Sequence, residues 1–133
     1  MMMNIVLMKK LLIITALLAS GCSTMSAETR FVTSNAVDVG STALALTRDG
    51  ISEGNPLGVG GMLAAKVAVY GVAKAAGGDV ECGIYKAAPI FDGAAANNLL
   101  LFLGYSAGAA ISGGALVAAY QFLTYENECG VSE

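Results

Sequence analysis

The stretch GAAANNLLLFLGYSAGAAISGGALVAAYQFLTY, residues 93–125, decides the fold. It holds no charged side chain over 33 positions. An uncharged apolar run of 18 or more residues is a candidate membrane helix. As one helix it would measure about 50 Å, against a hydrocarbon core of about 30 Å. It is therefore expected to tilt, to protrude, or to break, either at Gly113-Gly114 or between Gly104 and Gly108.

Two shorter apolar segments precede this run. The first covers about 34–48, and the second covers about 56–76, where Gly77-Gly78 stops it. The fold class predicted is all-α, with two to three membrane helices at about 34–48, 56–76 and 93–123 after a cleaved signal peptide. The alternative is a soluble helical bundle, which needs charged outer faces, and the longest run offers none.

Helix-capping residues support these boundaries. Ser34 or Asn35 is expected to cap the first helix, and Gly50 is expected to end it in a left-handed conformation. Asn55 followed by Pro56 is a typical start for the second helix, with proline at the first helical position.

Composition excludes several classes of function. Of the 133 residues, 56% are hydrophobic and 13% are charged, whereas an average soluble domain has about 25% charged residues. The mean hydropathy is +0.67. A net charge of −3 excludes the basic surface expected of a protein that binds nucleic acid, so no nucleic-acid partner is expected. With no histidine and no metal-ligand spacing, we expect no catalysis, no metal and no cofactor.

The amino terminus reads as a bacterial export signal. Met8-Lys9-Lys10 is a basic start, an apolar run covers 11–18, and small residues lead to Cys22. The sequence Ala19-Ser20-Gly21-Cys22 resembles the lipobox of bacterial lipoproteins, which implies signal removal and acylation of Cys22. Met8 is the expected natural start.

These features predict four regions along the chain. We expect a signal peptide at 1–21, a lipidated polar tether at 22–33, a helical membrane domain at 34–125 and an acidic tail at 126–133. Two alternatives remain for the first region, namely an uncleaved membrane helix and a plain signal cut near Ala27.

Cys82 and Cys129 are a candidate disulfide pair, because an even number of cysteines in an exported chain favours a bond. The bond requires both sulfurs on one side of the membrane. If three helices span the membrane after Cys22, Cys82 and Cys129 lie on opposite sides and cannot form the bond. If the long run folds back as two short helices, the two sulfurs share a side.

Asp38 and Lys66 are ionisable residues inside apolar segments, where such groups are costly and usually paired or functional. Each lies 14 residues from Ser52, the expected turn of a helical hairpin. Equal offsets predict similar depth and an ion pair. The polar layer would also include the hydroxyls and amides that share this depth: Ser41, Thr42, Asn97 and Asn98.

Two interpretations of this polar layer stay open. It is either a structural cluster that fixes the register of the helices or an ion or proton path. A single pair without histidine favours the structural interpretation.

Small residues recur every four positions at Gly104, Gly108 and Ser112, and again at Gly60, Ala64 and Ala68. This spacing is typical of helices that pack closely in membranes. We expect these positions to form helix–helix contacts.

The order and spacing of polar residues over about 36–74 resemble a family of uncharacterised small integral membrane proteins. Its pattern is D-x-x-[ST]-T, then G-x-x-E-x-N-P-L and a downstream lysine, matched here by Asp38, Thr42, Glu53, Asn55, Pro56 and Lys66. The resemblance implies two or three membrane helices and no assigned activity. Glu53, Asn55 and Pro56 are interpreted as turn and cap residues.

The functional prediction is a small lipid-anchored helical membrane protein of the bacterial cell envelope with a structural or interaction role. Expected partners are membrane lipid and either a second copy or a larger envelope protein. The alternatives are a transport-accessory or membrane-active protein using Asp38 and Lys66, and an outer-membrane lipoprotein with a soluble helical domain. Ser23 after Cys22 favours the outer membrane, but helical spans are atypical there, so the inner membrane is preferred.

Overall fold

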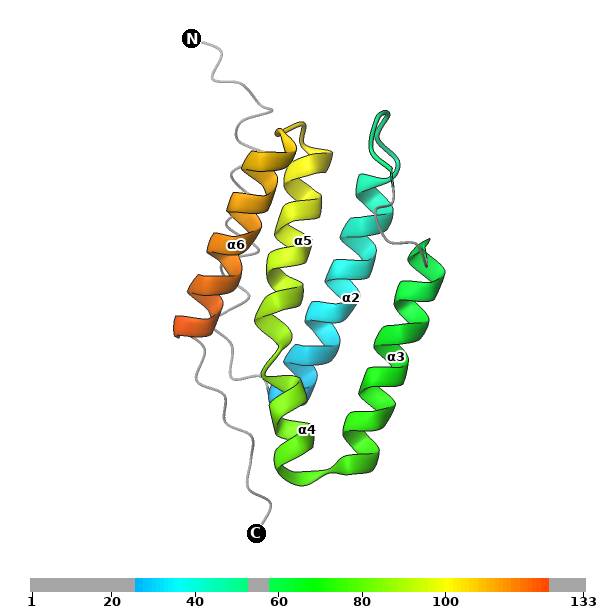
Figure 1. The fold of residues 1–133 in the computed structure, drawn as a ribbon, viewed down its shortest axis with the longest axis vertical. Helices are drawn as coiled ribbons and strands as arrows, with labels where there is room; N and C mark the ends of the chain where they lie inside the picture. The colour runs from blue at the N-terminus through cyan, green and yellow to red at the C-terminus, as the bar shows by residue number, and fades with distance from the viewer. Residues whose placement is uncertain (1–25, 53–57, 125–133) are drawn as a thin grey trace.

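The computed structural model describes residues 26–52 and 58–124. Within these ranges the chain forms helices and no strand (Figure 1), which confirms the all-α prediction. With the labels of Figure 1, the helices are α2 (Ala27–Ala45), α3 (Gly58–Ala76), α4 (Gly78–Tyr85), α5 (Ala88–Phe102) and α6 (Ala107–Thr124).

The long helices stand side by side in the order α3, α2, α5, α6 (Figure 1). The chain runs up α2, down α3, up through α4 and α5, and down α6, with the short α4 below α5. Helix α2 packs against α3 and α5, and α5 packs against α2 and α6, so α2 and α5 are the inner helices of the bundle. The predicted antiparallel hairpin of the first two segments is present as α2 and α3.

Helix α2 begins seven residues earlier than predicted. Ser26 is its N-cap, with Oγ accepting a hydrogen bond from the Thr29 backbone N–H at 3.2 Å. Ser34 and Asn35 are buried inside the helix, so the prediction that either caps it is wrong, and residues 27–33 are helical rather than part of a tether. The early turns escaped detection because the buried face of α2 is polar, which removes the apolar periodicity that marks a helix.

The uncharged run folds as a hairpin of two helices. Helix α5 begins before the run, at Ala88 with Pro89 in its first turn, and α6 carries the rest. The chain turns at residues 103–106, where Gly104 has φ +95°, a conformation that favours glycine. Of the two predicted break points, the one at Gly104 is confirmed, and Gly113-Gly114 lies within α6.

Arg48 fixes this turn from the end of α2. Its Nη1 donates to the backbone carbonyls of Leu101 and Phe102 at 3.1 and 2.7 Å. These carbonyls belong to the last turn of α5, which leaves acceptors that basic side chains commonly satisfy. A Cβ at Gly104 would meet the guanidinium at 2.7 Å, so the same glycine also makes room for the cap.

Gly77 and Gly78 end α3 as predicted, with φ of 63° and 54°. Helix α4 directly after them was not predicted. The predicted turn and cap residues Glu53, Asn55 and Pro56 fall outside the described residues, as do Cys22 and the acidic tail.

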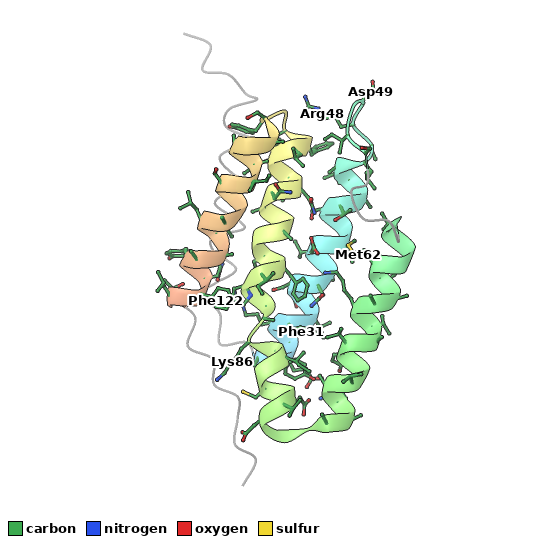
Figure 2. All side chains as sticks on the ribbon, in the orientation of Figure 1. Phe31, Arg48, Asp49, Met62, Lys86 and Phe122 are labelled. Carbon is green, nitrogen blue, oxygen red and sulfur yellow. The ribbon has the colours of Figure 1, made fainter. Side chains whose placement is uncertain are left out.

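Burial is inverted relative to a water-soluble bundle. The buried side chains include charged and amide groups, whereas large aliphatic and aromatic side chains face outward from α3 and α6 (Figure 2). Leu116 is 72% exposed, Leu123 is 87% exposed and Val67 is 62% exposed. In α3 only Ala73 is buried. Among the described residues, no leucine, isoleucine or valine is buried, whereas many of these side chains lie on the outer surface.

The exposed charges of the described residues gather at the two ends of the bundle. Arg48 and Asp49 lie at one end, and Lys86 lies toward the other (Figure 2). Between the ends, the charged side chains are buried in pairs. Helices α3 and α6 are long and apolar enough to cross a membrane, by length and composition.

Candidate functional site

A polar layer joins the middle of α2 to α3. Lys66 Nζ lies 2.7 Å from Asp38 Oδ2 and donates to Asn35 Oδ1 at 3.0 Å. The side chains of Asp38 and Lys66 are 7% and 11% exposed. The ion pair predicted from equal offsets is thus present in the structure.

Helix α5 joins this layer through Asn98. Its amide nitrogen donates to Thr42 Oγ1 at 2.8 Å and to Asp38 Oδ1 at 3.2 Å. Thr42 in turn donates its hydroxyl proton to the Asp38 backbone carbonyl at 2.8 Å, which leaves its oxygen free to accept. Asn97, predicted in the same layer, donates only to the Asn98 side chain, at 3.4 Å, and its Oδ1 has no partner among the described residues.

The ammonium group of Lys66 makes two hydrogen bonds and one aromatic contact. The hydrogen bonds go to Asp38 and Asn35, and the nitrogen lies 3.9 Å from the centroid of the Phe91 ring, a cation–π geometry. Both oxygens of the Asp38 carboxylate accept hydrogen bonds. The layer therefore holds three helices together by mutually satisfied groups.

A second buried pair links the start of α2 to α5 and α6. Arg30 Nη2 lies 2.7 Å from Asp92 Oδ2 and donates to Gln121 Oε1 at 2.5 Å. Gln121 is fully buried, and Arg30 is 5% exposed. Since a buried charge requires a partner, this cluster fixes α6 against α2 across the bundle.

A third cluster lies where α2, α3 and α4 meet. Lys74 Nζ bridges Glu28 at 2.8 Å and Glu81 at 3.0 Å. On α4, hydrogen bonds from Tyr85 and Lys74 lower the pKa of Glu81. Burial, and then the hydrogen bond to Glu81, raises the pKa of Tyr85 to about 12. Tyr85 also packs on Phe31, with ring centroids 5.3 Å apart, so the cluster encloses a small apolar core.

Close helix packing uses different glycines from those predicted. Gly104 lies in a turn, and Gly108 and Ser112 are exposed, so none of the three packs α5 on α6. The contact is made instead by Gly93 and Gly114, where an added Cβ would come within 2.7 and 2.5 Å of the opposite carbonyl oxygen. The turn at Gly104 interrupts the helix that the four-residue spacing assumes. The other set, Gly60, Ala64 and Ala68, is exposed on α3. Contacts of these small residues with another molecule stay a prediction.

Cys82, on α4, is disulfide-bonded. The two other cysteines, Cys22 and Cys129, lie outside the described residues. Because α5 and α6 fold back on each other, α4 and the end of α6 lie toward the same end of the bundle (Figure 1). Thr124, the last described residue of α6, precedes Cys129 by five positions in the sequence.

We predict a Cys82–Cys129 bond. Digestion of alkylated, unreduced protein after Lys, Arg and Glu releases the peptides 82–86 and 129–133, and mass spectrometry should find them linked. Reduction before alkylation, as the control, should separate them. A link from Cys82 to Cys22 would refute the prediction and would also exclude acylation of the Cys22 sulfur.

Sequence reasoning missed the Arg30 cluster because it treated residues 23–33 as a tether. The signal was present, since Arg30, Ser34 and Asp38 follow each other at four-residue intervals and so share one helical face. Gln121 was detectable as the only amide within 99–124 of an otherwise apolar run.

Comparison with known proteins identifies no similar protein. The chain matches no protein-family model, no curated protein and no solved structure. The resemblance built on Asp38, Thr42 and Lys66 stays a prediction.

Proposed function

We propose that the chain is a small lipid-anchored helical membrane protein of the bacterial cell envelope, with a structural or interaction role. The observation that supports this most is the inverted burial of the described bundle. Charged pairs are enclosed between helices, aliphatic side chains face outward, and exposed charges gather at the ends. Water would disfavour such a surface, whereas hydrocarbon favours it.

The dimensions of the bundle fit this proposal. Helices α2 and α3 have 19 residues each, or about 28 Å at 1.5 Å per residue, close to the hydrocarbon thickness of about 30 Å. Helix α2 carries buried charges that lower its hydropathy, and α5 has only 15 residues. Both helices cross next to other helices, which supply partners for the Asp38 and Asn98 side chains.

The proposed topology places the start of α2 and the end of α6 on the side of the membrane that faces away from the cytoplasm. Four crossings after an exported Cys22 return the chain to its starting side. A disulfide at Cys82 requires an oxidising compartment, and α4 lies at the end where α2 begins (Figure 1). The turn capped by Arg48 then faces the cytoplasm. The inner membrane is the proposed location, because helical spans are atypical of the outer membrane.

A structural role for the Asp38–Lys66 layer is preferred to an ion path. Lys66 donates to Asp38 and Asn35 and lies over the Phe91 ring, and each carboxylate oxygen of Asp38 accepts a hydrogen bond. A relay group must exchange partners as the ion passes, whereas this arrangement fixes the order of α3, α2 and α5. Binding to other proteins is assigned to the exposed apolar faces of α3 and α6.

An alkaline carbonate wash of membranes tests integral insertion. The variant Cys22→Ala removes the lipid, and it should stay in the membrane pellet because the helices hold it there. A second variant, in which 1–22 is replaced by an export signal that is fully removed, excludes retention by an uncleaved signal.

A lipoprotein with a known soluble domain, stripped of its acylated cysteine, is the matched control and should appear in the wash. If the second variant washes off and is monomeric without detergent, the bundle is water-soluble and the proposal is wrong.

A further inference from the structure

An open groove runs between α2 and α3. It has a volume of about 310 Å³ and follows 31–39 of α2 and 63–70 of α3. Its walls are apolar and are formed by Val32, Ala36, Val39, Leu63, Val67 and Tyr70. Val32 and Leu63 are about half exposed. In a membrane this groove opens sideways into hydrocarbon.

The polar side chains that line the groove already have hydrogen-bond partners within the protein, so they are not available to bind a polar ligand. Lys66 is committed to Asp38, Asn35 and the Phe91 ring. The Tyr70 hydroxyl donates to Glu28 Oε1 at 2.6 Å. The surface that remains suits a flexible apolar chain.

We propose that an acyl chain carried by Cys22 lies in this groove of its own molecule. The inference rests on the proposed acylation of Cys22. Only residues 23–25 separate Cys22 from Ser26, the N-cap of α2, and this connection spans at most about 14 Å when fully extended.

The groove begins within reach of that anchor. Phe31, at its near end, is five residues beyond Ser26, or about 7 Å along the helix axis. The acyl chain therefore enters the bilayer beside the start of α2 and runs toward the midplane along the groove. Attachment makes this binding intramolecular, so the local concentration of the attached chain exceeds that of any free lipid at this site.

Filling the groove extends the apolar contact between α3 and α2. In α3 only Ala73 is buried, and it packs with Phe31 of α2 in the small apolar core near α4. Lys66, Tyr70 and Lys74 make polar links to α2. A hydrocarbon chain between the two helices covers the facing walls and joins α3 to the bundle by packing.

Photocrosslinking with a diazirine-bearing palmitate analogue, fed to cells that express the full chain, tests the inference. Mass spectrometry first asks whether the analogue is on Cys22. After irradiation we expect the Cys22 peptide to be linked to 31–39 and 63–70 at least fivefold more often than to the exposed side chains of α6. Copies of two isotopic compositions in one cell distinguish links within a molecule from links between molecules.

Two substitutions provide the comparison. Ala36→Phe fills the groove and should reduce its crosslinks several-fold, and Leu63→Phe should do the same from the α3 wall. Ala43→Phe, on an exposed part of α2 outside the groove, is the matched control and should leave them unchanged. All three must resist the carbonate wash to be compared.

The outcomes separate the possible occupants. Acylated Cys22 with links spread evenly over α3 and α6 overturns the inference and leaves the lipid anchor intact. Adducts of free phospholipid in the groove, or links between isotopically distinct copies, assign it to bulk lipid or to a second copy and also overturn it. Absence of the analogue from Cys22 refutes the acylation and the inference together.

Discussion

Replacing Asp38 by alanine should lower the free energy of unfolding by about 3–5 kcal/mol, the usual effect of stranding one partner of a buried ion pair. Lys66 would keep its charge in a site where its nitrogen now lies 2.7 Å from a carboxylate. Asn98 would also lose an acceptor. Denaturation in detergent micelles, followed by circular dichroism, measures the change, and the steady-state level of the protein in membranes should fall with it.

The double variant separates pairing from simple damage. Lys66→Met removes the stranded charge and keeps the length of the side chain, so Asp38→Ala with Lys66→Met should be more stable than Asp38→Ala alone. Rescue should be partial, because Asn35 and Asn98 each lose a partner. Asp49→Ala, at an exposed position beyond α2, is the matched control and should change stability little. Losses that add in the double variant would contradict the pairing.

Gly114→Ala should lower the free energy of unfolding by about 1–3 kcal/mol, the usual effect of overpacking a close contact. The new Cβ would lie 2.5 Å from the Gly93 carbonyl oxygen and 3.0 Å from the Asn97 Cβ. Helices α5 and α6 must separate to admit it. The same denaturation measurement in micelles tests this expectation.

Gly108→Ala, in the same helix, is the control with the opposite expected sign. Nothing lies within 4 Å of the position its Cβ would take, and alanine favours helix over glycine by up to about 1 kcal/mol. Gly108→Ala should therefore be neutral or stabilising. Equal destabilisation by both substitutions would contradict the assignment of the close contact to Gly93 and Gly114.

Because Gly108 and Ser112 are exposed, substitutions at these positions can test whether α6 associates with another molecule. Gly108→Leu should leave the fold of one molecule intact and should weaken association if this face of α6 meets a partner. Gly104→Leu is unsuitable for that purpose, because Gly104 has φ +95° and faces the Arg48 guanidinium.

The sequence predicted the presence of helices far better than it predicted where they begin and end. The uncharged run and the Gly77-Gly78 stop are local features, and the structure has helices and a stop where they indicate. The start of α2 was missed because its inward face carries Arg30, Ser34 and Asp38, so the apolar pattern is inverted there. In a membrane bundle the lipid-facing side of each helix is apolar. A sequence pattern that assumes an apolar inner face therefore does not detect such a helix.

The polar layer was predictable in part. Asp38 and Lys66 are 28 positions apart in one hairpin, so a turn near Ser52 was enough to bring them to one depth. Arg30 and Gln121 are 91 positions apart, and no spacing rule relates residues in helices that are not consecutive. That contact depends on α6 folding back on α5.

The amino-acid sequence by itself determined that this chain is helical, that its longest run is apolar enough for hydrocarbon, and that its few internal charges need partners. These properties follow from local composition. Helix hydrogen bonds join residues four positions apart, and the hydropathy of a segment is set by its own side chains. The tertiary structure alone decided which charges meet, that Gly93 and Gly114 form the close contact, and that the end of α6 returns toward Cys82. Those outcomes depend on the turn at Gly104 and on the order α3, α2, α5, α6, which are properties of the assembled bundle.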